Sequence, residues 1–346
     1  MVSTQSCKAS PARVAVIVPA YGLADLVGEA LHSLQRQTFP DWECIVIDDG
    51  SPDDVAGAVA PFLADPRIRF LATANHGVSA ARNFSIRRST SPLIALLDAD
   101  DLFRPDYLAT MVPVMEADPS IRFATCNARI FGAVPQERLC FDHRQGKNDD
   151  GRGTLADVLD RTFGVYIGSI FRRTDFDAIG GFDESMAMSE DFDLWVRLLQ
   201  LGGEARYVNR VMCDYRVRAS SASSDGKRML LGNLKVYEKA RKTLPADCPD
   251  RALLERLITR QRDALAFEHA IDWVIGGDTA RGIAALSALH GEQVEGAVWR
   301  FAFSLWRLFP GLAPGMLRWR RQAHARGKQS RLSSTLRAKA VTLQQF

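Results

Sequence analysis

The segment Pro92-Leu-Ile-Ala-Leu-Leu-Asp-Ala-Asp-Asp101 passes from a continuous apolar run to three carboxylates within ten residues. Such a short apolar run is typical of a strand buried on both faces of a parallel sheet. Three neighbouring carboxylates repel one another unless a cation offsets their charge. Magnesium and manganese prefer oxygen ligands, which favours Asp98 and Asp100 as metal ligands. The alternative is an ordinary Asp-rich turn that caps a helix beginning near Pro105.

The same alternation of strand and helix extends toward the N-terminus. Strands that alternate with helices predict an α/β fold, with a mostly parallel sheet flanked by helices. In such sheets ligands bind beyond the carboxyl ends of the strands, where the acidic clusters 48–49 and 98–101 both fall. The strand-like runs are 13–18, 42–47, 67–71 and 92–97, and the helix-like segments between them include 53–63 and 78–89.

Two further side chains near this predicted edge have a functional and an ordinary interpretation. Asp49 could accept a hydrogen bond from a nucleotide base or a ribose hydroxyl, or it could bond its own backbone in a turn. Arg82 follows Gly77-Val-Ser-Ala-Ala in a helix that begins with small residues. It is either a surface arginine or a contact for a phosphate or nucleotide.

The middle of the chain is more mixed and carries a second acidic motif, Ser189-Glu-Asp-Phe-Asp-Leu-Trp195. Ser189 suits a helix N-cap, and acidic residues are favoured in a first helical turn. The functional interpretation makes Asp191 a general base that deprotonates an acceptor hydroxyl, opposite a metal that neutralises a departing diphosphate. Strands are expected at 121–131 and 166–171, helices at 155–161 and 191–201, and loops at 142–153 and 219–227, the second of which could close over a substrate.

The composition of the 346 residues is that of a globular protein, with 47% hydrophobic and 25% charged residues. The net charge of +3 gives no reason to expect a nucleic-acid partner. The six cysteines show no Cys-x-x-Cys spacing, which argues against a zinc site or a disulfide framework and favours a reducing compartment. The first residues lack the pattern of a secretory signal, so a cytoplasmic location is expected.

Beyond Arg228 the chain is expected to be helical, and its last part is both aromatic and basic. No acidic residue follows Glu295, and Arg300 and Arg307 lie seven residues apart, on one helical face. These arginines disfavour a spanning helix and favour an in-plane amphipathic helix on the anionic inner face of a membrane. The alternative is that the aromatic face packs on the catalytic domain. The expected organisation is a flexible N-terminus at 1–12, a catalytic domain at 13–226, a helical region at 227–325 and a disordered basic tail at 326–346.

Taken in order, several short motifs closely resemble those of the family 2 glycosyltransferases. Each motif alone has little specificity, whereas their ordered combination between about Arg13 and Ser224 is highly specific. They are Val16-Ile-Val-Pro-Ala-Tyr21, Ser33-Leu-Gln-Arg-Gln37, Ile45-Val-Ile-Asp-Asp-Gly-Ser51, Ala80-Ala-Arg-Asn83, Leu97-Asp-Ala-Asp-Asp101, Gly180-Gly-Phe-Asp-Glu184 and Glu190-Asp-Phe-Asp-Leu-Trp195.

The resemblance implies a GT-A (Rossmann-like) fold and an inverting transfer from a nucleotide-diphosphate sugar, with Mn²⁺ or Mg²⁺ as cofactor. It implies the following roles, motif by motif. The nucleoside would be bound by Pro19, Ala20, Tyr21 and Asp49, and the nucleotide would be contacted by Arg82 and Arg218. Asp98 would bind the ribose and the metal, and Asp100 would bind the metal. The catalytic residues would be Asp191 and Glu190, and the acceptor would be bound by Trp195. Asp101 would be a helix-start residue rather than a ligand.

The sequence departs from the family pattern at two positions. Gly22 stands where an Asn often follows the Tyr, and Arg218 stands where a His usually ends the Tyr-Arg-x-His element. No Gln-x-x-Arg-Trp motif is present, which disfavours a polymerising synthase and favours one sugar per encounter.

The expected substrates are a nucleotide sugar, most commonly a UDP-sugar in this family, and a glycan or lipid-linked acceptor. The expected process is the assembly of cell-surface polysaccharide, lipopolysaccharide or glycolipid. A non-catalytic nucleotide-sugar-binding scaffold of the same fold is the alternative. A phosphatase with an Asp nucleophile is disfavoured because the first strand carries no acid, and no phosphate-binding glycine loop supports an ATPase or dehydrogenase.

Overall fold

The computed structural model describes residues 11–141, 151–218, 226–289, 294 and 296–321. Internal contacts divide the chain into two compact units, one ending at Arg216 and one formed mainly by residues from Val217 onward. Two short segments, 132–137 and 159–161, belong to the second unit. Most of the predicted flexible N-terminus, most of both predicted loops and the whole predicted tail lie outside the described residues. The described ends of the two loops are not loops, because residues 152–153 form a short strand and residues 226–227 begin a helix.

The first unit is built on one mixed sheet, with strand order β3-β2-β1-β4-β9-β6-β10-β5. Strands β3, β2, β1 and β4 are parallel, whereas β9 runs antiparallel to both β4 and β6. The short strands β7 and β8 pair with β6 and β10. The bounds are β1 Val14–Ala20, β2 Trp42–Asp48, β3 Ile68–Ala72, β4 Leu93–Leu96, β5 Leu102–Phe103, β6 Ile121–Gly132, β7 Arg138–Leu139, β8 Arg152–Gly153, β9 Ile170–Arg172 and β10 Glu204–Val217.

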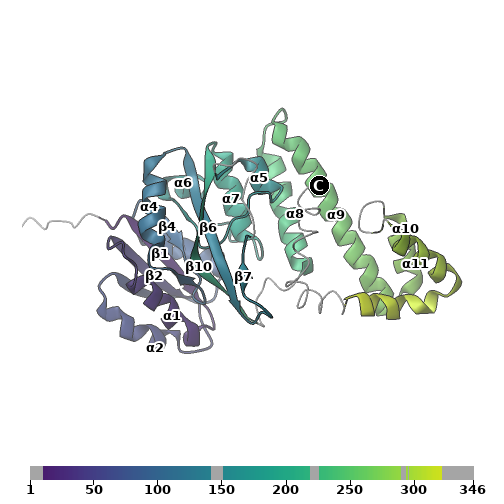
Figure 1. Ribbon diagram of the computed structural model, residues 1–346, viewed down its shortest axis with the longest axis horizontal. Coiled ribbons are helices and arrows are strands. Elements are labelled where there is room, and N and C mark those ends of the chain that lie inside the picture. The colour runs from purple at the N-terminus through teal and green to yellow at the C-terminus, as the bar shows by residue number, and fades with distance from the viewer. Residues whose placement is uncertain (1–10, 142–150, 219–225, 290–293, 295, 322–346) are drawn as a thin grey trace, which may run out of the picture. The chain divides into compact units, whose positions relative to one another are not determined.

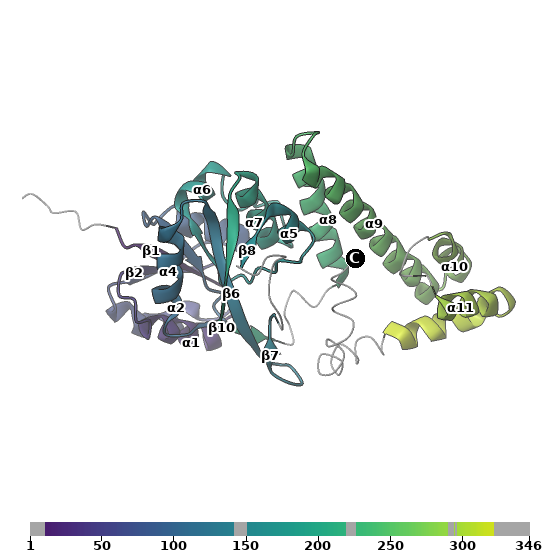
Figure 2. The same cartoon turned by 45° about the horizontal axis from the view of Figure 1, so that its top comes forward.

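Helices flank this sheet, as Figures 1 and 2 show. Every residue of β1 is buried, which explains its unbroken apolar sequence. Apolar positions on α1 recur at helical spacing, so Val27, Leu31 and Leu34 pack into the main core. The helices are α1 Ala24–Gln35, α2 Val55–Val59 with η1 Ala60–Ala64, α3 Val78–Ile86, α4 Tyr107–Ala117, α5 Leu155–Leu159, α6 Arg173–Ala178 and α7 Glu190–Gln200.

These elements confirm the predicted α/β fold. The apolar runs of the sequence predicted the parallel strands of the sheet. Two strand predictions need correction. The strand predicted at 166–171 is confined to Ile170–Arg172, because the chain bends at residues 167–168. The 14-residue strand β10 was not predicted, because its burial alternates irregularly and polar residues interrupt the apolar pattern.

The second unit is helical throughout its described C-terminal part, as predicted. Its helices are α8 Gly226–Thr243, α9 Pro249–Gly276, α10 Thr279–Ala288 and α11 Ala297–Leu308, followed by η3 Pro310–Leu312 and a helical stretch at 313–321. Within this unit, α8 and α9 lie side by side, and α10 and α11 gather near the C-terminal end of α9 (Figure 2). No helix among the described residues is long and apolar enough to cross a membrane.

Candidate active site

The carboxyl ends of three parallel strands lie at one edge of the sheet. Ala20 of β1 is in register with Asp48 of β2, and Ile17 of β1 with Leu96 of β4. The segments that follow these strands, which carry Tyr21, Asp49 and Asp98, therefore start at the same edge. This is the edge at which ligands bind in open α/β sheets.

The Asp98–Asp101 segment forms a tight turn directly after β4, in which the Asp101 amide donates to the Asp98 carbonyl at 2.9 Å. The side chain of Asp98 is 30% exposed, and Asp100 is half-buried. Among the described residues there is no cluster of three or more metal-ligating side chains. Two accessible carboxylates nevertheless fit Mg²⁺ or Mn²⁺, which proteins commonly hold with one or two carboxylates together with substrate phosphates.

Arg82 connects this turn to the second acidic motif. Its side chain is 3% exposed, and its Nη2 and Nη1 donate to Asp98 Oδ1 at 2.8 Å and to Glu190 Oε1 at 3.0 Å. Burial lowers the pKa of Arg82, but the carboxylates of Asp98 and Glu190 more than offset this, so the pKa is raised overall. A buried, permanently charged guanidinium thus holds two motifs together that are about ninety residues apart in the sequence. The described contacts make Arg82 a bridge between carboxylates; the predicted contact with the nucleotide stays a prediction.

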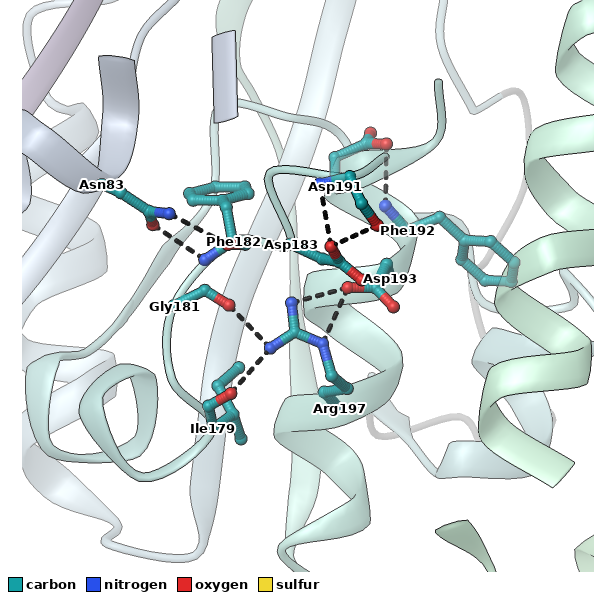
Figure 3. Close-up of polar contacts among 10 residues, drawn as sticks. Asn83, Ile179, Gly181, Phe182, Asp183, Asp191, Phe192, Asp193 and Arg197 are labelled. Carbon is teal, nitrogen blue, oxygen red and sulfur yellow. Dashed lines mark hydrogen bonds and ion pairs between the residues drawn. The ribbon is translucent and has the colours of Figure 1, made fainter. Parts of the chain in front are cut away.

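Glu190 and Asp191 begin α7. Ser189 occupies the N-cap position of α7, as predicted, but its backbone is left-handed, with φ of 59°, and its side chain makes no cap hydrogen bond. Asp191 instead accepts a hydrogen bond from the Phe192 amide through Oδ1 at 2.7 Å (Figure 3). Asp191 is half-buried, which leaves part of its carboxylate accessible.

The Gly180–Glu184 loop fixes the start of α7. Asn83 of α3 donates to the Phe182 carbonyl at 2.9 Å and accepts from the Phe182 amide at 2.9 Å (Figure 3). Gly181 has a φ of 82°, and a Cβ there would lie 2.7 Å from Asn83 Oδ1, so only glycine fits this close approach. On the other side of the loop, Arg197 donates to the Ile179 and Gly181 carbonyls and pairs with Asp193. These contacts hold Asp191 on a rigid support.

The environment of Glu190 predicts that this residue contributes to the free energy of unfolding in a pH-dependent way. Burial, and next the charge of Asp191, raise the pKa of Glu190 above its usual range, although Arg82 acts in the opposite direction. The folded chain therefore binds this proton more tightly than the unfolded chain, and ionisation of Glu190 reduces the free energy of unfolding as pH rises. The wild-type chain should be most stable relative to a Glu190→Gln variant below about pH 4, near the ordinary pKa of Glu.

As pH rises from there through the raised pKa of Glu190, this relative stability should fall. Thermal denaturation midpoints of both chains, measured across that window, check the sign. A difference that stays constant or grows with pH would contradict it.

Asp49 is 4% exposed, and both of its oxygens accept backbone hydrogen bonds. Oδ1 accepts from the His76 amide at 2.9 Å and Oδ2 from the Gly77 amide at 2.8 Å. Asp49 therefore holds the loop that leads into α3, and its predicted contact with the nucleotide base stays a prediction. Asp48, the residue before it, accepts from the Ser51 amide at 2.8 Å.

Tyr21 lies just beyond β1 and is 52% exposed, whereas Ala20 is 1% exposed and Pro19 is buried. Gly22 adopts a φ of 64° and donates through its amide to the Ser51 hydroxyl at 3.2 Å. Asn also tolerates this left-handed backbone better than most residues. This explains how Gly22 can stand where the family often has Asn.

Two predicted roles are corrected by the structure. Trp195 was expected to bind the acceptor, but it is 1% exposed and its ring lies 4.9 Å from Phe123 and 5.8 Å from Phe171, so it is a core residue. Asp101 was expected to start a helix, but α4 begins only at Tyr107. Asp101 is fully buried, and it accepts from the Tyr166 hydroxyl at 2.6 Å and the Arg216 amide at 2.8 Å.

Arg216 is a site residue that the sequence did not single out. Its Nε donates to the Asp100 carbonyl at 2.9 Å, its Nη2 pairs with Glu29 at 2.7 Å, and its guanidinium lies over the Phe131 ring. Arg216 thus places a cation against the acidic turn. The signal that could have identified Arg216 is its position as the arginine of the Tyr-Arg-x-His-like element, two residues before Arg218. Arg218 belongs to the second unit, so its predicted role in nucleotide binding stays a prediction.

Comparison with known proteins supplies the family. The model of glycosyl transferase family 2 matches residues 15–180. The succinoglycan biosynthesis protein ExoU of Rhizobium meliloti is 30% identical over 287 residues, which cover 76% of this chain and 80% of ExoU. The UDP-Glc:alpha-D-GlcNAc-diphosphoundecaprenol beta-1,3-glucosyltransferase WfgD of Escherichia coli is 27% identical over 222 residues, covering 61% of this chain and 80% of WfgD.

Solved structures agree on the fold. The mannosyltransferase PcManGT from Pyrobaculum calidifontis, in complex with GDP-Man and Mn²⁺, is similar with a TM-score of 0.59 and 20% identity, covering 90% of this chain and 88% of that one. The chain spans only 17–29% of the length of several other curated relatives. The ordered motifs, the GT-A architecture and the match to ExoU lead to one conclusion: the chain belongs to glycosyltransferase family 2.

Proposed function

We propose that this chain transfers a sugar from a nucleotide-diphosphate sugar to an acceptor hydroxyl, with inversion at the anomeric carbon. One observation carries the proposal above all others. The buried guanidinium of Arg82 contacts both Asp98 of the acidic turn and Glu190 beside Asp191. A candidate metal site and a candidate base are therefore held in one connected arrangement, as a displacement of a diphosphate requires.

In the proposed reaction, Asp191 accepts the proton of the acceptor hydroxyl as its oxygen attacks the anomeric carbon. A bond forms between that oxygen and the anomeric carbon, while the bond from the anomeric carbon to the diphosphate oxygen breaks. Asp98 and Asp100 would hold Mn²⁺ or Mg²⁺, which when bound neutralises charge on the leaving diphosphate. The Arg216 guanidinium, which contacts the Asp100 carbonyl, adds a second positive charge beside this turn.

Glu190 has a positioning role in this scheme. Its carboxylate is tied to Arg82 and adjoins Asp191 at the start of α7, so it fixes the helix end that carries the base. The buried Asp101 similarly joins the acidic turn to Tyr166 and to the Arg216 backbone. Both acids therefore act through neighbouring groups.

The substrates are proposed from the relatives. WfgD, by its name, uses UDP-Glc and a diphosphoundecaprenol-linked acceptor, and ExoU takes part in succinoglycan biosynthesis. We accordingly propose that this chain acts in the cytoplasm and takes part in the assembly of a cell-surface polysaccharide or glycolipid. Its donor would be a UDP-sugar and its acceptor would be lipid-linked. The predicted domain 13–226 would carry out this transfer.

A screen of nucleotide sugars by thermal shift, with and without manganese, tests the proposal directly. Binding stabilises the folded chain by RT ln(1 + [L]/Kd), so the preferred donor should raise Tm by the largest amount. The shift should shrink when EDTA replaces manganese, because no divalent cation would then neutralise the charge of the donor diphosphate. Hydrolysis of the preferred donor separates an enzyme from a non-catalytic scaffold, which would bind the donor without releasing nucleotide.

An Asp100→Asn variant gives a sharper test of the metal site. Loss of one of two carboxylate ligands should abolish most of the manganese-dependent part of the donor shift and of turnover. Asp106→Asn, on the loop before α4, is the matched control and should behave as the wild type. Equal manganese dependence in Asp100→Asn and wild type would contradict the assignment of Asp100.

A further inference from the structure

Helix α11 presents three distinct faces, although only three of its twelve residues are polar. One face packs into the small core of the second unit, where Ala302 and Trp306 are buried and Trp299 and Phe303 are partly buried. This core also includes residues of α9, α10 and the stretch 313–321. The inward face of α11 thus has its partners within the unit.

The second face is a basic stripe. Arg300, Ser304 and Arg307 are all exposed, and their spacing of three or four residues places them along one side of the helix. Neither arginine forms an ion pair with any residue that the structure describes. No acidic residue follows Glu295 in the sequence to neutralise them.

The third face is apolar and open to solvent. Val298 is 81% exposed, Phe301 68% and Leu308 74%, and Leu305 lies between them on the same side of the helix. The exposure continues after the helix, where Phe309 and Leu312 are 58% and 49% exposed and Trp319 is 71% exposed. Seven of the 13 large apolar side chains that the structure shows exposed lie within residues 298–319, so this is a concentrated patch.

We propose that this outer face, formed by Val298, Phe301, Leu305 and Leu308 and continued by Phe309 and Leu312, inserts into the interface of an anionic lipid bilayer. No residue that the structure describes covers this face, and a concentrated exposed apolar patch of this kind marks an interaction site. Arg300 and Arg307, on the adjoining face, would contact lipid phosphates, because an in-plane helix keeps its basic side at the headgroup level. Attachment would confine the chain to the surface on which a lipid-linked acceptor lies.

A second copy of this chain fits the face less well than lipid does. Two copies meeting there would bring the unneutralised arginines of both into one interface, with no carboxylate beyond Glu295 to pair them. The interleaving of aromatic side chains with arginine suits a lipid interface, where one end of each residue is wet. Charge complementarity thus selects an anionic leaflet.

Co-sedimentation of the full chain with vesicles of phosphatidylglycerol or phosphatidylcholine tests this inference. The wild type should bind phosphatidylglycerol vesicles and bind those of phosphatidylcholine much less. A Phe301→Ser/Leu308→Ser double variant should lose roughly tenfold or more of its partition coefficient per residue, since burying each large apolar side chain is worth about that factor. Arg300→Gln/Arg307→Gln should lose mainly the preference for the anionic lipid, by about fivefold per charge.

The matched control is Leu63→Ser/Leu231→Ser, which removes two leucines that are 45% and 51% exposed elsewhere in the chain. It should bind vesicles as the wild type does. Quenching of Trp319 fluorescence by brominated phosphatidylglycerol, lost in Trp319→Phe, gives a second readout that does not depend on the serine variants folding. Donor hydrolysis without vesicles should be unchanged in every variant, which separates this inference from the proposed catalytic function.

Three results would overturn the inference. The first is failure of the intact chain to bind phosphatidylglycerol vesicles. The second is equal binding by the Phe301→Ser/Leu308→Ser variant and the Leu63→Ser/Leu231→Ser control. The third is a concentration-dependent dimer, seen by light scattering, that the face variant abolishes while vesicle binding is absent, which would assign the face to a second copy.

Discussion

Replacing Asp191 with Asn is expected to reduce sugar transfer by about 10²–10⁴-fold, the usual contribution of a positioned general base. The substitution keeps the side-chain shape and an oxygen that can still accept from the Phe192 amide, a bond of 2.7 Å in the wild type. What it removes is the capacity to take the proton of the acceptor hydroxyl. Single-turnover rates at saturating donor should fall, while the donor-induced rise in Tm should stay at the wild-type value.

The control for this experiment is Asp177→Asn, which changes an exposed carboxylate on α6 and should leave transfer unaffected. The pattern of losses decides the role of Asp191. Weakened donor binding with an unchanged single-turnover rate would show that Asp191 binds the donor rather than acting as a base. Normal transfer by the variant would remove Asp191 from the reaction altogether.

Replacing Arg82 with Met is expected to destabilise the first unit by about 3 kcal/mol, the lower end of the range for breaking a buried ion pair. The side chain of Arg82 is 3% exposed, and its removal leaves the carboxylates of Asp98 and Glu190 close together without a cation. Those two side chains are 30% and 18% exposed, so water partly solvates the unpaired carboxylates. The expected loss of stability therefore lies at the lower end of that range. Denaturant unfolding followed by tryptophan fluorescence measures this difference.

Arg87→Met provides the comparison, because Arg87 is exposed at the end of the same helix α3 and should change stability by less than about 0.5 kcal/mol. Arg82→Lys should fall between the two, since one ammonium keeps the charge but cannot reach both carboxylates in the fixed geometry of a guanidinium. Low pH should partly rescue Arg82→Met, because protonation of Glu190, whose pKa is already raised by burial, removes its repulsion with the Asp98 carboxylate. Equal stability of Arg82→Met and Arg87→Met would show that the bridge contributes little to the fold.

The apolar runs of the sequence determined the parallel half of the sheet. Runs such as Val14–Ala20 and Leu93–Leu96 are buried on both faces, so their composition alone distinguishes them from a surface strand, whereas the edge strand β3 is only partly buried. Because parallel strands end at one edge, the placement of Asp48, Asp49, Asp98 and Asp100 beyond such runs also predicted where the site lies. The acidic motif at Glu190 was similarly visible, since a polar first turn followed by apolar helical spacing marks the start of α7.

The tertiary structure alone decided which way the neighbouring side chains point. Arg82 lies on a short helix that has small residues just before it, and nothing local shows that its guanidinium turns inward to reach Glu190, 108 residues away. Trp195 carries the same ambiguity, because a shift of one residue around α7 separates buried from exposed positions, and Trp195 is 1% exposed. Asp101 became a buried anchor only because β10, a strand with no clear apolar pattern, brings Arg216 beside it.

In the C-terminal helix α11, too, the sequence determined some features and tertiary packing decided others. Its sequence determined that α11 is aromatic, basic and without acids, which follows from composition alone. The spacing of Arg300, Ser304 and Arg307 marks one polar face, but the remaining positions are all apolar, so the sequence could not show which of them face the core. Packing against α9 and α10 selected Trp299, Ala302 and Trp306 for the inside and left Phe301 and Leu308 outside. Sequence therefore fixes which residues follow one another and which segments can be buried, whereas long-range packing decides which side chains meet.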